Sequence, residues 1–135
     1  MERRLQALLV SLADARLVRS AHDVSDGGLA VTLAECCFDT NGMGAEVTLD
    51  GAHSTAATLF GESASCVLVS VSPDDVTPVL EQAAAAGVNA KMIGQTGGNR
   101  IRIAVAGSMA LDVAVDEAER RWSSAIARYF ARRVA

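Results

Sequence analysis

The segment from His22 to Gly28 carries the set of polar side chains with the clearest chemical potential. A short strand, expected over residues 18–23, would deliver Asp23, Ser25 and Asp26 to a Gly27-Gly28 turn, and a helix would start immediately afterwards. The free N–H groups of a first helical turn attract anions. A carboxylate beside such a site can hold Mg²⁺ against phosphate oxygens. The pattern therefore indicates a site for a Mg²⁺-nucleotide or a phosphate group.

The same residues also have a purely structural interpretation. Ser25 or Asp26 could cap the following helix, and Gly27-Gly28 could simply form a tight turn. The chain contains neither a Walker motif nor a dinucleotide-binding glycine pattern. The residues by themselves leave both interpretations open.

Helical and strand patterns alternate along the chain, which predicts an α+β fold with α/β-like order, a single mixed β-sheet covered by helices. We expect one domain over residues 1–135. The expected helices are 2–16, 29–38, 54–59, 73–86 and 116–132, and the expected strands are 18–23, 45–49, 66–72, 90–95, 100–105 and 109–115. Hairpin-type turns are expected at 96–99 and 107–108. Ser72 is expected to cap the fourth helix, with Pro73 at its first position. The last helix is expected to pack through Ala118, Trp122, Ile126, Tyr129 and Phe130.

Composition narrows the class of protein. The 135 residues are 50% hydrophobic, and 12 Lys and Arg against 16 Asp and Glu give a net charge of -4. This balance argues against disorder and against general electrostatic binding to nucleic acid or to an anionic membrane. The sequence shows neither a membrane-spanning run nor a signal peptide, so a cytoplasmic location is predicted. Cys36, Cys37 and Cys66 lack disulfide or zinc spacing, and Cys36 and Cys37, inside an apolar helical stretch, are interpreted as core thiols.

Four motifs in order resemble the phosphoribosylformylglycinamidine synthase family of purine biosynthesis. The first is His-Asp-Val-Ser-Asp-Gly-Gly-Leu-Ala-Val-Thr-Leu-Ala-Glu, residues 22–35. The others are Leu-Phe-Gly-Glu-Ser at 59–63 followed by a strand at 67–71, Ile93-Gly94 followed by Gly97-Gly98, and Trp122 in the closing helix. The resemblance covers nearly the whole chain.

The resemblance implies a fold like the C-terminal domain of aminoimidazole ribonucleotide synthetase, and a chain that is the last C-domain of a much longer enzyme. That family is an ATP-dependent carbon–nitrogen ligase. It joins glutamine-derived ammonia to formylglycinamide ribonucleotide, giving the amidine. The implied partners are the remaining domains of the parent enzyme, a glutaminase subunit and a small accessory subunit. The chain alone is expected to be inactive, and exposed apolar surface predicts self-association.

Residue roles carry over only where the motifs match. The resemblance implies that Asp23 binds Mg²⁺ at an auxiliary ATP or ADP site, that Ser25 touches the nucleotide, and that Gly27 and Gly28 form the turn of that site. Glu62 and Ser63 are secondary candidates for substrate contact. No catalytic residue is assigned, and His22 is interpreted as structural. Cys66 stands where the family usually has an arginine. The alternatives are a scaffold module that holds a structural nucleotide, or a C-domain of another member of the superfamily.

Overall fold

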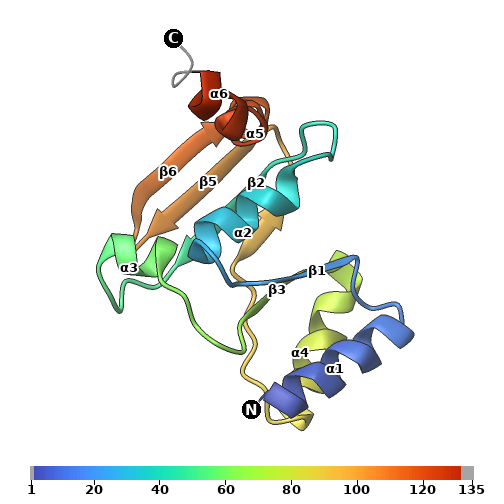
Figure 1. Ribbon diagram of the computed structural model, residues 1–135. Helices are drawn as coiled ribbons and strands as arrows, with labels where there is room; N and C mark the ends of the chain where they lie inside the picture. The colour runs from blue at the N-terminus through green and yellow to red at the C-terminus, as the bar shows by residue number, and fades with distance from the viewer. Residues whose placement is uncertain (1, 132–135) are drawn as a thin grey trace. The chain divides into compact units, whose positions relative to one another are not determined.

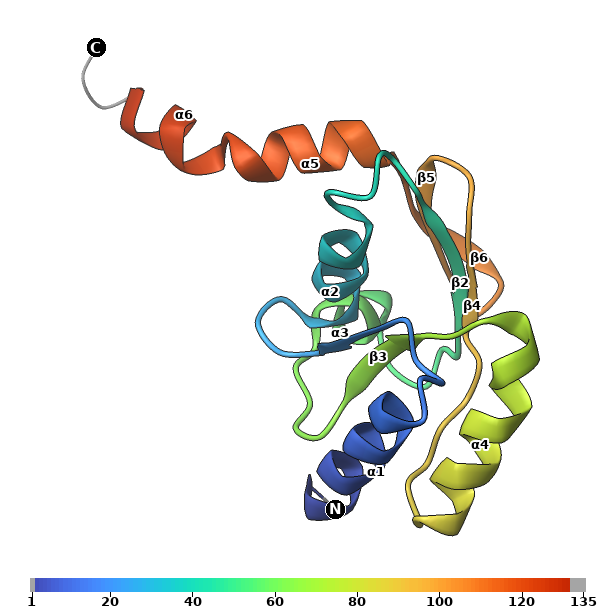
Figure 2. The same ribbon diagram turned by 90° about the vertical axis from the view of Figure 1, so that its right-hand side faces the viewer.

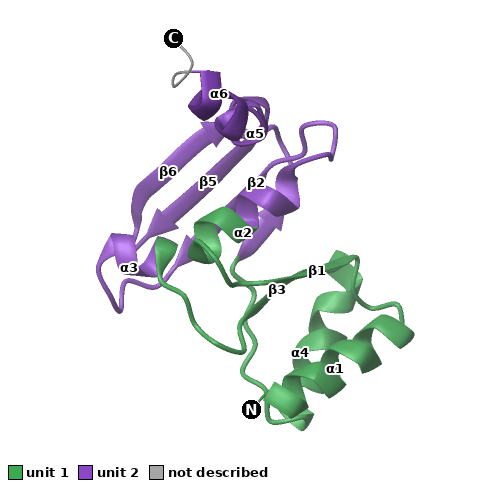
Figure 3. Cartoon of the chain, viewed as in Figure 1, with its two compact units in different colours: residues 1–32, 60–93 green, residues 33–59, 94–135 purple. Residues whose placement is uncertain are grey.

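The computed structural model describes residues 2–131 (Figure 1). The chain divides into two compact units, shown in Figure 3. Unit 1 comprises residues 1–32 and 60–93, and unit 2 comprises residues 33–59 and 94–135. The chain passes between the units at three points, and the helix α2 (Gly28–Cys37) contributes residues to both. The prediction of a single domain over residues 1–135 stays a prediction.

Unit 1 is built from helices around a small aliphatic core. Its elements are α1 (Glu2–Asp14), β1 (Ser20–Asp23), the start of α2, β3 (Val67–Ser70), the 3-10 turn η1 (Pro73–Asp75) and α4 (Val76–Ala85). The helices α1 and α4 lie side by side in both views (Figures 1 and 2). Leu8 and Leu12 of α1 pack with Val79 and Ala83 of α4. Each pair is spaced by four residues, which places its members on one helical face.

Unit 2 contains a four-stranded mixed sheet. Its elements are β2 (Ala45–Leu49), most of α3 (Thr55–Phe60), β4 (Gly94–Thr96), β5 (Arg100–Val105), β6 (Ser108–Ala114), α5 (Val115–Ser123) and α6 (Ala125–Ala131). The strand order is β4-β2-β5-β6, with β2 and β5 parallel and the other pairs antiparallel. Alternate residues of the two central strands are buried: Ala45, Val47, Leu49, Ile101, Ile103 and Val105. The predicted mixed sheet with helices is confirmed.

Two details of the predicted sheet are wrong. First, β1 and β3 pair only with each other, as a separate two-stranded antiparallel sheet, so the strands form two sheets and not one. Second, residues 96–99 do not close a hairpin, because β2 lies between β4 and β5. The amide of Gly44, just before β2, donates to the carbonyl of Gly98 at 3.0 Å, and its carbonyl accepts from Gly97 at 2.8 Å. A side chain at Gly44 would collide with the Arg100 backbone.

The second expected hairpin is present. Val105 of β5 faces Ser108 of β6, so the connection has two residues, Ala106 and Gly107. Their φ angles are +50° and +80°. Positive φ at both central positions is the conformation that matches the twist of a two-residue hairpin.

Helix ends account for two further differences. Ser72 makes no side-chain cap; its hydroxyl accepts instead from Arg19 Nε at 3.0 Å and Nη2 at 2.9 Å, while Pro73 does occupy the first turn. The last helix is interrupted at Ser124, which separates α5 from α6, and residue 132 lies outside the described residues. Its expected packing stripe is largely exposed: Trp122 is 59% exposed and Ile126 is 74% exposed.

The cysteines agree with a packing role where they are buried. Cys37 is 4% exposed, and burial raises the pKa of its thiol to about 11. Burial, with a smaller effect of the nearby Glu35 charge, also raises the pKa of Cys36. Cys66 is exposed. Across residues 2–131, no helix has the length and apolarity that a bilayer crossing requires.

Candidate functional site

A hollow of about 410 Å³ in unit 1 is the candidate site. Three segments form its walls: the start of α1, the end of β1 with the turn that follows, and the loop that leads into β3. Four residues singled out from the sequence line it together, namely Asp23, Ser25, Glu62 and Ser63. The motif at 22–28 and the loop at 60–63 are therefore two parts of one site.

The pairing of β1 with β3 explains why these distant segments meet. The two strands are antiparallel, with Asp23 opposite Val67, so the end of β1 lies beside the start of β3. The ladder is extended by one more bond, from the amide of Val24 to the carbonyl of Cys66 at 2.9 Å. The polar turn that follows β1 and the loop that precedes β3 consequently open at the same edge.

The two glycines shape the turn and do not line the hollow. Gly27 and Gly28 have φ of +85° and +68°, a region that residues with a side chain rarely adopt. The amide of Gly28 donates to the carbonyl of Ser25 at 3.1 Å, which closes the turn at the start of α2. The amide of Gly27 donates to Glu62 Oε1 at 3.4 Å. Gly27 thus ties the turn to the loop that carries Glu62.

Asp23 is held by its backbone, and its carboxylate lies close to His22, with Oδ1 3.7 Å from Nδ1. Its carbonyl oxygen accepts from Thr32 Oγ1 at 3.3 Å and lies 2.8 Å from His22 Nδ1. A carbonyl only accepts, so His22 carries its proton on Nδ1 in this contact. The Asp23 side chain is 72% exposed. The exposure of the Asp23 carboxylate leaves it accessible to a ligand.

The charge of the hollow determines what it can bind. Among its described lining residues, Glu2, Asp23 and Glu62 are acidic and none is basic. Cys66, at the position where the resembled family has an arginine, lines the hollow as well. A bare phosphate would meet only negative charge here, so an anionic ligand requires an accompanying cation.

The donor set fits Mg²⁺ and does not form a complete protein cage. Over residues 2–131, no three His, Cys, Asp or Glu side chains gather closely enough to hold a metal by themselves. Magnesium commonly takes one or two protein oxygens and completes its shell with water and phosphate oxygens. The Asp23 carboxylate and the Ser25 hydroxyl line the same hollow and are oxygen donors of the kind such an ion requires.

Sequence reasoning missed one wall of the hollow. Glu2, Leu5, Gln6 and Leu9 of α1 line it, and the hydroxyl of Ser65 donates to Glu2 Oε2 at 3.3 Å. The first helix reads in the sequence as a packing element. Its second, polar contribution depends on how α1 approaches the loop before β3, which no local pattern encodes.

Comparison with known proteins assigns the chain to a family. Residues 1–106 match the family model described as "AIR synthase related protein, C-terminal domain". The chain is 36% identical over 131 residues to the phosphoribosylformylglycinamidine synthase subunit PurL of Moorella thermoacetica, covering 97% of this chain and 18% of that protein. It is 41% identical over 122 residues to the PurL subunit of Chlorobaculum tepidum, covering 86% of this chain and 16% of that protein. The chain thus spans less than a fifth of these curated relatives.

Solved structures show the same fold. Thermotoga maritima PurL complexed with FGAR superposes with a TM-score of 0.79 at 22% identity, covering 87% of this chain and 21% of that one. The same protein complexed with ATP gives a TM-score of 0.78 at 21% identity, covering 86% and 21%. At these identities the likeness concerns the fold alone.

Proposed function

Because the chain belongs to the family of AIR synthase related protein C-terminal domains, we propose that it is the last C-terminal domain of a phosphoribosylformylglycinamidine synthase large subunit. The parent enzyme is an ATP-dependent ligase that converts formylglycinamide ribonucleotide and glutamine-derived ammonia to the amidine. The matched relatives carry the name of that subunit and extend well beyond this chain. The observation that carries the proposal is the joining of two motifs of that family, at 22–28 and 60–63, in one hollow.

Within the parent enzyme, this domain holds the phosphate end of an ATP or ADP molecule. The Asp23 carboxylate would hold Mg²⁺, the Ser25 hydroxyl would contact the nucleotide, and the turn formed by Gly27 and Gly28 would fix where these two groups lie. Bound Mg²⁺ neutralises phosphate charge in a hollow whose own charged groups are acidic. Glu62 braces the turn through the Gly27 amide, while Ser63 remains the candidate for direct substrate contact.

The proposal includes the setting of the enzyme. The remaining domains of the parent supply most of the substrate-binding and catalytic groups, and a glutaminase subunit and a small accessory subunit complete the complex. A Thermotoga maritima structure named PurLQS is among the proteins of the same fold. The domain alone is inactive as a ligase and acts in the cytoplasm.

Nucleotide binding by this chain tests the site directly. We expect titration calorimetry to detect ADP or ATP binding in the presence of Mg²⁺ and none in excess chelator. The Asp23→Asn variant should bind at least about tenfold more weakly, since it loses a charged metal ligand. Asp26→Asn is the matched control, because it removes the same charge from the same turn at a residue outside the lining. Equal losses in the two variants, or binding that persists in chelator, would contradict the proposed site.

A second experiment separates a catalytic contribution from a scaffold role. In the full-length parent, the Asp23→Asn change is introduced, and turnover is compared with the mass of the assembled complex. Lower turnover with intact assembly supports participation in the ligase reaction. Loss of assembly with unchanged turnover per assembled complex supports a structural nucleotide clamp, the alternative function.

A further inference from the structure

The charges of this chain are separated along its length. Residues 120–135 contain five arginines and no acidic residue, so this C-terminal segment carries a charge of about +5. Residues 1–119 hold the other seven basic residues and all sixteen acidic ones, a charge of about -9. The modest net charge of -4 therefore conceals two regions of opposite sign.

The described part of the C-terminal segment is amphipathic. Arg120, Ser124 and Arg128 recur every four residues and, with Arg121 and Glu117, line a polar hollow on one side of α5 and α6. Trp122, Ile126 and Tyr129 are spaced by four and three residues and fall on the opposite side, because each residue turns the helix by about 100°. The segment thus has one cationic face and one apolar face.

The apolar face begins beside Phe38 and continues along α6, all within unit 2. The Trp122 ring lies 5.5 Å from the Phe38 ring, which anchors the start of the face. Further along, Ile126 is 74% exposed and Phe130 is 61% exposed, and α6 contains no buried residue. Figure 2 shows α5 and α6 running on past the sheet of unit 2. An apolar face of this length on a surface helix indicates a contact surface.

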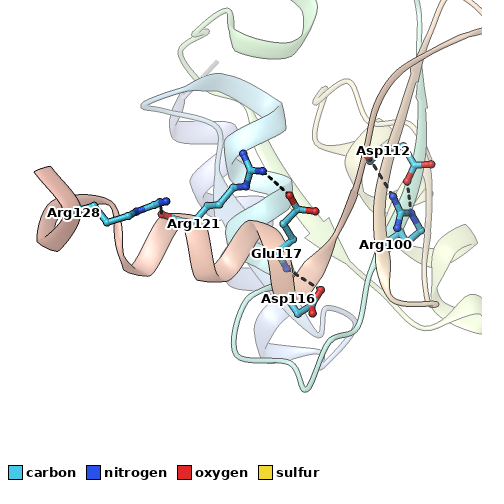
Figure 4. A network of polar contacts seen from close by, with 6 residues as sticks. All are labelled: Arg100, Asp112, Asp116, Glu117, Arg121 and Arg128. Atoms are coloured by element: carbon cyan, nitrogen blue, oxygen red, sulfur yellow. Dashed lines mark hydrogen bonds and ion pairs between the residues drawn. The ribbon is translucent and has the colours of Figure 1, made fainter.

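Internal contacts keep the cationic face in place. Arg121 Nη2 pairs with Glu117 Oε1 at 2.7 Å, and Arg128 Nη2 donates to the Arg121 carbonyl at 2.9 Å (Figure 4). The second contact links α6 to α5 across the break at Ser124. The two short helices therefore present their arginines together.

We propose that the C-terminal segment docks on residues 1–119 of a second copy of this chain, which carry the opposite net charge. The segment is basic and apolar, and the rest of the chain is the acidic partner that its charge requires. A two-fold arrangement lets each copy give its segment and receive that of the other. A polyanionic membrane or nucleic acid is disfavoured as the occupant, because it would also meet the charge of about -9 on residues 1–119.

Sedimentation equilibrium of the whole chain tests the proposal. We expect an average mass above the monomer value of 14.0 kDa, increasing with protein concentration and decreasing as NaCl is raised from about 50 mM to about 500 mM, since salt screens exposed charges. Arg120→Glu with Arg128→Glu should abolish the association by reversing the cationic face. Ile126→Ser with Phe130→Ser should abolish it by removing the apolar face. Circular dichroism confirms that each variant remains folded.

The matched control is Arg3→Glu with Arg4→Glu, which makes the same charge change on the exposed side of α1. This variant makes the receiving part of the chain more acidic, so it should associate at least as strongly as the unaltered chain. Removal of residues 120–135 provides a second test that does not depend on how the variants fold, and should leave a monomer at every concentration. A monomeric unaltered chain, or association that survives the removal, overturns the proposal. Sedimentation of the monomer with anionic lipid vesicles or duplex DNA would also overturn it and assign the segment to that polyanion.

Discussion

The polar turn after β1 depends on the conformation of Gly27. Its φ is +85°, and a Cβ placed there would lie 2.6 Å from Cγ2 of Val31. Its amide also reaches Glu62, so one residue carries a conformational requirement, a steric requirement and a contact with the second motif. We therefore expect a substitution of Gly27 to affect the stability of the fold more than it affects ligand binding.

We expect Gly27→Ala to lower the free energy of unfolding by about 1–3 kcal/mol, the range for a non-glycine residue forced into this backbone region against a close neighbour. Urea denaturation measures the change. Gly42→Ala is the matched control, since Gly42 has a similar φ of +83° with no atom within 4 Å of the added Cβ. Its loss should be smaller, because only the backbone cost remains. Equal losses would show that the Val31 contact contributes nothing.

The sequence indicates which residues could bind a ligand, but it does not show which of them lie close together in the fold. The types and order of Asp23, Ser25 and the glycines indicate a phosphate or metal site, because that chemistry is local. The meeting of Glu62 with Gly27 spans 35 residues. It follows from the register of β1 with β3, which cannot be predicted from the residues that flank Gly27 or Glu62 in the sequence.

Asp112 of β6 connects two strands at the level of elements. It accepts from Arg100 Nε, and its Oδ2 lies 3.5 Å from Arg102 Nε; both arginines are on β5. The hydrogen bond from Arg100, assisted by the charges of both arginines, lowers the pKa of the Asp112 carboxyl. The Arg100 contact is drawn in Figure 4.

The lowered pKa makes this contact sensitive to acid. A carboxyl whose pKa is lower when folded stabilises the fold above its unfolded pKa, and that stabilisation disappears as pH falls through the folded value. We expect Asp112→Asn to reduce the thermal midpoint near neutral pH. The difference from the unaltered chain should shrink below the ordinary value of 3.8. Asp74→Asn removes the same charge at an exposed residue of η1, away from this contact, and should leave the thermal midpoint near neutral pH unchanged. A difference that persists at low pH would refute the assignment.

Local patterns predicted most elements and fewer of their pairings. Alternating burial in β2 and β5 followed the alternation in the sequence. The turn at residues 96–99 resembles a hairpin in the sequence, yet β2 takes the place beside β4. The decisive feature is Gly44, whose missing side chain lets the Arg100 backbone approach. That requirement is non-local, so the turn residues did not reveal it.

The two units share α2, so we expect the stability of one unit to depend on the stability of the other. Residues 28–32 of this helix belong to unit 1 and residues 33–37 to unit 2. Because the helix stabilises itself cooperatively, loss of one half weakens the other. A substitution that destabilises unit 1 should therefore also lower the stability of unit 2.

Leu12→Ala tests this coupling. Leu12 is 2% exposed in the core of unit 1, so its truncation should cost about 2–5 kcal/mol. We expect the fluorescence of Trp122, the single tryptophan, which lies in unit 2, to report a lower urea midpoint. Val10→Ala, at a position 62% exposed on the same helix, should change stability by no more than about 0.5 kcal/mol. An unchanged Trp122 transition in Leu12→Ala would mean that the units unfold independently.

The separation of charge along the sequence places five arginines in one terminal segment and every acidic residue in the rest of the chain. The chain's isoelectric point near 5.1 suggests behaviour as a simple anion at neutral pH. A charged surface, however, senses the nearest region of the molecule and not the average. The chain would approach an anion exchanger through residues 1–119 and a cation exchanger through its arginine-rich end. We therefore expect the chain to be retained on both resins at one pH, because its arginines are concentrated at the C-terminal end of the sequence.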